Sequence, residues 1–158
     1  FLDAYSSDNI PVHLITLEAL NIYLKKLKQN GLLIFNVSNK YVDIEPVLHE
    51  AAKAIGIMSV AKVSMAQEIE GTNLRGLPTH FVALSYNETL INSLKNKEWS
   101  TTMPRTGVKT WTDQYSNVFS VLGNHISMKR IRALHKEKSE NEANINENID
   151  TNSIEKLE

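Results

Sequence analysis

A short apolar run, Leu32-Leu33-Ile34-Phe35-Asn36-Val37, directly follows a stretch of helical periodicity. In that stretch leucines recur at three- and four-residue steps, which predicts an amphipathic helix over Val12 to Gln29. Asn30-Gly31 is expected to end this helix in the left-handed conformation. A run so short and so apolar is typical of a strand buried on both faces. The first third of the chain therefore predicts a helix packed on a sheet.

The alternation continues along the chain. Asp43 is placed to cap a second helix that ends at Gly56. Two β segments follow, Ile57 to Met65 and Thr79 to Tyr86, and because no helix separates them we expect them to pair antiparallel. The order predicts an α/β fold in which parallel strands alternate with helices and end in an antiparallel strand pair.

Composition excludes several classes of protein. The 158 residues are 42% hydrophobic and 22% charged, which suits one globular domain, and the net charge of -1 gives no reason to expect a nucleic-acid partner. The absence of cysteine excludes disulfides and thiolate chemistry and fits a cytoplasmic protein. No stretch reaches the roughly 18 apolar residues that a membrane-spanning helix needs.

The organised part of the chain is expected to cover residues 1–122. A basic helix is predicted over 123–138. The segment 139–158 is acidic, rich in Asn and without aromatic residues, so we expect it to be disordered.

Acidic residues follow the first apolar segment. Phe1-Leu2 leads into Asp3, and Asp8 lies at the far side of a small polar loop. In open α/β sheets ligands bind beyond the carboxyl ends of the strands, so acids at such a place are candidates for a binding site. The alternative is that short acids only shape the turn and cap the helix. Asp113 carries the same two interpretations.

The histidines show no metal-ligand spacing such as His-Glu-x-x-His, and we expect no metal. His13, beside the polar loop, is interpreted as a first-turn structural residue. Four more histidines are interpreted as structural or exposed to solvent: His49, His80, His125 and His135.

Several separated motifs resemble the spermidine synthase-like family of polyamine aminopropyltransferases, in the form fused to a transporter-like membrane region. The opening loop resembles the Asp-Ser-Ser-Asp-Pro loop of that family, with two extra residues between Asp3 and Asp8. Three further motifs in the same order are Thr16-Leu17-Glu18-Ala19, Val37-Ser38-Asn39-Lys40-Tyr41 and Trp111-Thr112-Asp113-Gln114-Tyr115-Ser116-Asn117. The resemblance implies the C-terminal half of a Rossmann-like, class I S-adenosylmethionine-dependent methyltransferase fold.

The resemblance also implies an activity and assigns roles. The reaction is aminopropyl transfer from decarboxylated S-adenosylmethionine to a putrescine-like polyamine, with no metal. Asp3 matches the catalytic proton acceptor, and Asp8 matches the acid that binds the amine substrate. Pro11 matches the proline that lies against the nucleoside of the cofactor. Asn36 stands where the family often carries a longer Gln, and with Asp113 it completes the expected substrate site.

The chain begins at Phe1, already at a strand end, and is expected to be the C-terminal piece of a larger domain. The Gly-rich turn and the ribose-binding acid of such folds belong to earlier strands. The missing N-terminal half of the same domain is therefore the expected partner, and the fragment alone is expected to be inactive. A homodimer and membrane attachment of the full-length parent stay open.

Two alternative functions remain: an S-adenosylmethionine-dependent methyltransferase, and a non-catalytic ligand-sensing domain of a membrane transporter.

Overall fold

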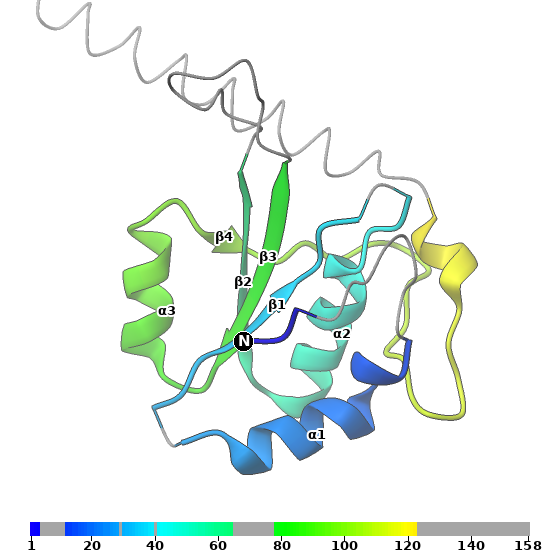
Figure 1. Ribbon diagram of the computed structural model, residues 1–158, viewed down its shortest axis with the longest axis horizontal. Helices are drawn as coiled ribbons and strands as arrows, with labels where there is room; N and C mark the ends of the chain where they lie inside the picture. The colour runs from blue at the N-terminus through cyan, green and yellow to red at the C-terminus, as the bar shows by residue number, and fades with distance from the viewer. Residues whose placement is uncertain (4–11, 29, 40, 65–77, 123–158) are drawn as a thin grey trace, which may run out of the picture. The chain divides into compact units, whose positions relative to one another are not determined.

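A four-stranded sheet forms the middle layer of the computed structural model (Figure 1). Its strands are β1 (Leu33–Asn36), β2 (Met58–Ser64), β3 (Thr79–Ser85) and β4 (Ser100–Thr101), in the order β1-β3-β2-β4. All pairings between these strands are antiparallel, including the predicted pairing of β2 with β3. Because β3 runs against both of its neighbours, β1 and β2 run in the same direction.

The structure describes residues 1–3, 12–28, 30–39, 41–64 and 78–122. These residues all lie within one unit, Phe1–Asn124. The predicted basic helix over 123–138 and the predicted disordered tail over 139–158 lie outside the described residues, as do Asp8 and Pro11.

Helices cover both faces of the sheet (Figure 1). On one face, α1 (Leu17–Lys26) and α2 (Glu45–Ile55) contribute to the larger core, and on the other face α3 (Glu88–Lys95) contributes to a smaller one. Short 3-10 helices, η1 (Val12–Leu14) and η2 (Val118–Val121), precede α1 and end the described part. None of the described helices is long and apolar enough to cross a lipid bilayer. The α/β class predicted from the sequence is confirmed.

Alternate side chains of a strand point into the two different cores. On β3, Val82 and Leu84 belong to the larger cluster, whereas Ala83 between them belongs to the cluster that includes Ile91 of α3. Successive residues of a strand point to opposite faces, which explains this alternation. A strand such as β3 therefore has to be apolar at nearly every position, and a charged residue within it needs a partner.

The first helix is shorter than the predicted Val12 to Gln29. Thr16 has an extended backbone, and its Oγ1 accepts a hydrogen bond from the Ala19 N–H at 3.2 Å, so α1 begins after it. The helix ends where Leu27 is extended again, and the predicted left-handed stop at Asn30-Gly31 is wrong. Gly31 is needed for space instead, because a Cβ there would lie 2.4 Å from Cγ of Leu27.

The start of α2 also differs from the prediction. Ile44, not Asp43, is the N-cap residue, and it makes no side-chain capping hydrogen bond. Asp43 lies one residue earlier, and its Oδ1 accepts the Glu45 N–H at 3.3 Å. The predicted end of the helix is confirmed: Gly56 is left-handed, with φ 76°.

The left-handed conformation of Gly56 gives a test of the fold. A Cβ at Gly56 would meet no atom within 4 Å, so the cost of Gly56→Ala comes from the backbone alone. We expect this substitution to lower the free energy of unfolding by about 1–2 kcal/mol in urea titrations. Gly56→Asn is the matched control, because Asn adopts this conformation more readily. Equal stabilities of wild type and Gly56→Ala would contradict the assignment.

Candidate functional site

Asp3 and Asn36 meet at the ends of two neighbouring extended segments. Leu2 forms a parallel bridge with Phe35, through a hydrogen bond from Leu2 N to Ile34 O of 2.8 Å and one from Asn36 N to Leu2 O of 3.0 Å. The next residue, Asp3, is exposed, and its Oδ1 accepts a hydrogen bond from Nδ2 of Asn36 at 3.1 Å. Two of the residues predicted for the site are therefore in direct contact, although 33 positions separate them.

Ser38 fixes which way the Asn36 amide points. Oδ1 of Asn36 accepts hydrogen bonds from the Ser38 N–H at 3.1 Å and from the Ser38 hydroxyl at 2.6 Å. The same hydroxyl oxygen accepts the His80 N–H at 2.8 Å. Because Oδ1 already faces two donors, the Nδ2 group of the amide is turned toward Asp3. Ser38 thus connects the exposed Asp3–Asn36 pair to β3.

Asp113, in the segment before η2, contacts the residues at the start of α1. Its Oδ1 accepts a hydrogen bond from the Thr16 hydroxyl at 2.8 Å, and its N–H donates to Oε2 of Glu18 at 3.0 Å. Nearby, the Leu17 N–H donates to Trp111 O at 2.8 Å, so the segment around Asp113 is held against the first turn of the helix. A carboxylate at this end of a helix is favourable, because the helix dipole is positive there. These contacts favour the capping interpretation of Asp113.

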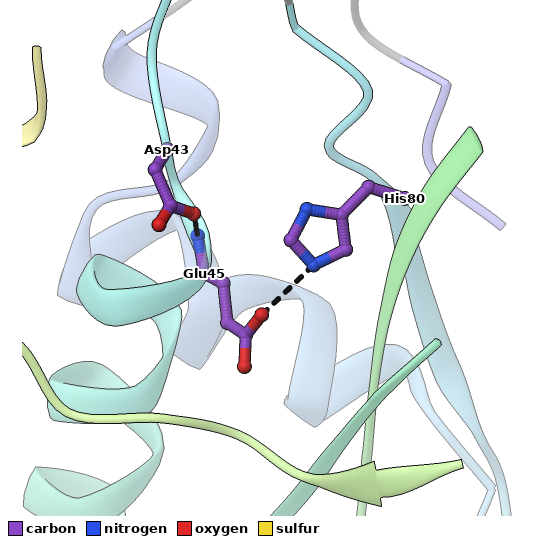
Figure 2. A group of neighbouring side chains, drawn as sticks. All are labelled: Asp43, Glu45 and His80. Carbon is purple, nitrogen blue, oxygen red and sulfur yellow. Dashed lines mark hydrogen bonds and ion pairs between the residues drawn. The ribbon is translucent and has the colours of Figure 1, made fainter. Parts of the chain in front are cut away.

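A second group of titratable residues is buried where the start of α2 meets β3 (Figure 2). Asp43 precedes α2, Glu45 is its first residue and His80 belongs to β3; their exposed fractions are 2%, 3% and 7%. Nε2 of His80 lies 2.9 Å from Oε2 of Glu45, and Oε1 of Glu45 accepts the Met103 N–H at 2.8 Å. We call Asp43, Glu45 and His80 the buried cluster.

The buried cluster is electrostatically unusual. Burial raises the pKa of the Asp43 carboxyl above its ordinary value, and the negative charge of Glu45 acts in the same direction. The positive charges of His80 and Arg105 and the hydrogen bond from the Glu45 N–H act against this increase. The ligand atoms of the three residues all lie within 4.8 Å of one another. Such a group can hold a proton between its members or a metal ion among them.

Sequence reasoning missed this cluster, and His80 had been interpreted only as structural or exposed. One signal was present: His80 is the only imidazole within the apolar run of β3. A polar side chain in such a strand needs a buried partner. Asp43 and Glu45, on either side of Ile44, are carboxylates that could supply this partner. Because 35 positions separate Glu45 from His80, no local sequence pattern indicates that they pair.

Comparisons with protein-family models, with curated proteins and with solved structures gave no match. The function of the chain is therefore inferred from its own residues and contacts.

The raised pKa of Asp43 predicts a pH dependence of stability. The folded chain binds the Asp43 proton more tightly than the unfolded chain, so this proton stabilises the fold at low pH. The contribution is lost as the pH rises through the folded-state pKa. Asp43→Asn does not titrate. We therefore expect the unfolding free energy of wild type, relative to Asp43→Asn, to fall as the pH rises above the ordinary Asp pKa of about 3.9.

Urea titrations across this pH range, with a chelator present so that only protons reach the cluster, measure the difference. Glu88→Gln is the comparison variant, since it removes one carboxylate from an exposed residue of α3 and corrects for the change in net charge. A difference between wild type and Asp43→Asn that stays constant with pH, or rises, would show that burial does not govern this carboxyl.

Proposed function

We propose that this chain forms the amine-binding and proton-accepting side of a spermidine synthase-like aminopropyltransferase domain. The observation that carries the proposal is the hydrogen bond between Asp3 and Asn36 at the ends of adjacent parallel segments. Ligands of open α/β sheets bind beyond such ends, and a carboxylate and an amide there suit a cationic amine. The motifs of the opening loop and of the segments after β1 and before η2 supply the family resemblance.

The arrangement of the strands supports the corresponding fold. Leu2 pairs parallel with Phe35 of β1, β1 and β2 run in one direction, and β3 runs against both. Helices cover both faces of this sheet (Figure 1). This agrees with the closing half of a class I methyltransferase-like domain, in which parallel strands end in an antiparallel pair.

In the proposed reaction, the amine nitrogen attacks the aminopropyl carbon that is bonded to the sulfonium of decarboxylated S-adenosylmethionine. The C–N bond forms as the C–S bond breaks, and the sulfur keeps the electron pair as methylthioadenosine leaves. Asp3 accepts the proton that the attacking nitrogen loses. Nδ2 of Asn36 orients the Asp3 carboxylate by donating to its Oδ1, and Ser38 holds the amide of Asn36 for this purpose.

The remaining roles follow from the resemblance. Asp8 binds the cationic end of the amine, and Pro11 lies against the nucleoside. The acceleration comes mainly from holding donor and acceptor in line.

The proposal is tested with the complete protein encoded by the reading frame that contains this chain. We expect aminopropyl transfer from decarboxylated S-adenosylmethionine to putrescine or a related amine. Asp3→Asn should lower kcat at least about 100-fold, because the attacking amine loses its base. Glu88→Gln, an exposed change on α3 at the other face of the sheet, is the control and should keep the wild-type rate.

Three outcomes would overturn the proposal. Transfer of a methyl group from S-adenosylmethionine would favour the methyltransferase alternative. Saturable amine binding without any transfer would favour a ligand-sensing domain. Full activity of Asp3→Asn would remove Asp3 from the chemistry.

A further inference from the structure

We propose that the buried cluster binds a divalent ion of the first transition series, with Asp43, Glu45 and His80 as its protein ligands. This inference is independent of the proposed function, which needs no metal. Figure 2 shows the three side chains converging from the segment before α2, from the first turn of α2 and from β3.

The distances are close to those of a coordination sphere. In a tetrahedral site, two ligand atoms about 2.1 Å from the ion lie about 3.4 Å apart. Nε2 of His80 and Oε2 of Glu45 are 2.9 Å apart. All three ligand atoms lie within 4.8 Å of one another. Side-chain movements of about 1 Å would place all three around one ion.

The carboxylate of Asp43 provides an independent reason. A carboxylate can accept about four hydrogen bonds. Asp43 is 2% exposed, and within the described residues its side chain accepts a single hydrogen bond, from the Glu45 N–H at 3.3 Å. Arg105, whose charge acts on Asp43, donates through Nη2 to Leu122 O, while its Nη1 is buried and donates to no atom of the described residues, Asp43 included. A buried carboxylate with so few donors is costly, and a coordinated cation would offset that cost.

The donor atoms select the class of ion. One imidazole nitrogen with two carboxylate oxygens suits Zn²⁺, Mn²⁺, Fe²⁺ or Co²⁺, whereas Mg²⁺ and Ca²⁺ prefer oxygen ligands alone. The ion would replace the proton between His80 and Glu45, which passes to solvent.

Hydrogen bonds already hold these ligands in place. The Met103 N–H binds Oε1 of Glu45, which leaves Oε2 directed at His80. The backbone of His80 is fixed on both sides: its N–H donates to the Ser38 hydroxyl, and its carbonyl accepts the Val37 N–H at 2.8 Å. Contacts of this kind orient metal ligands and raise affinity.

Isothermal titration calorimetry with Zn²⁺ tests the proposal, with Mg²⁺ as the contrasting ion. We expect one saturable Zn²⁺ site in the wild-type chain and an affinity at least about 10-fold lower in Asp43→Asn. Asp43→Asn removes a buried charge while keeping the size of the side chain, and circular dichroism checks that it folds. His13→Ala, at an exposed histidine, is the matched control and should bind as wild type does. The double variant His125→Ala/His135→Ala tests whether the two histidines outside the described residues contribute to Zn²⁺ binding.

A second measurement needs no substitution. In NMR titrations of the wild-type chain with Mn²⁺, the ring signals of His80 should broaden at lower ion concentration than those of His13. Absence of a saturable Zn²⁺ site, equal affinities of wild type and Asp43→Asn, or earlier broadening of His13 would each overturn the proposal. The buried cluster would then be a structural ion pair alone.

Discussion

The buried Glu45 carboxylate, through its hydrogen bond to His80 and a second one to Met103, holds together three parts of the chain that are distant in sequence. Glu45 begins α2, His80 lies on β3, and the other carboxylate oxygen of Glu45 accepts the Met103 N–H from the segment after β4. Removing either partner would leave a buried polar or charged group unsatisfied, which costs more than the net value of one hydrogen bond. The placement of α2 against the sheet depends on this contact as well as on apolar packing.

His80 also supports the exposed pair formed by Asp3 and Asn36. The backbone of His80 binds the Ser38 hydroxyl, Ser38 turns the amide of Asn36, and Asn36 contacts Asp3. The Asp3 carboxylate is therefore connected through three successive hydrogen-bonded steps to a buried position. In the proposed reaction such a connection restricts where the base can lie, which is what an oriented displacement requires.

The sequence predicted the presence of helices and strands better than their ends. It identified Asp3 and Asn36 as site residues, but it did not identify the buried cluster. Periodicity located α1 and α2, and the absence of a helix between the two β segments indicated that β2 pairs with β3, because these signals are local. The stop at Asn30-Gly31 was wrong because Gly31 is set by its closeness to Leu27, a contact that no local pattern encodes. Asp3 and Asn36 could be assigned to one site because each lies at the end of an extended segment, and such ends lie side by side in a sheet. The buried cluster could not be predicted, because its members become neighbours only when α2 packs against β3.

If the contact between His80 and Glu45 positions α2 against the sheet, the two residues are energetically coupled. A double-mutant cycle with Glu45→Gln, His80→Gln and the combined variant, followed by urea unfolding with a chelator present, measures this coupling. We expect a coupling energy of about 1.5–3 kcal/mol, as for a hydrogen bond to a charged group. Single-variant effects that add to the effect of the combined variant within about 0.5 kcal/mol would contradict it.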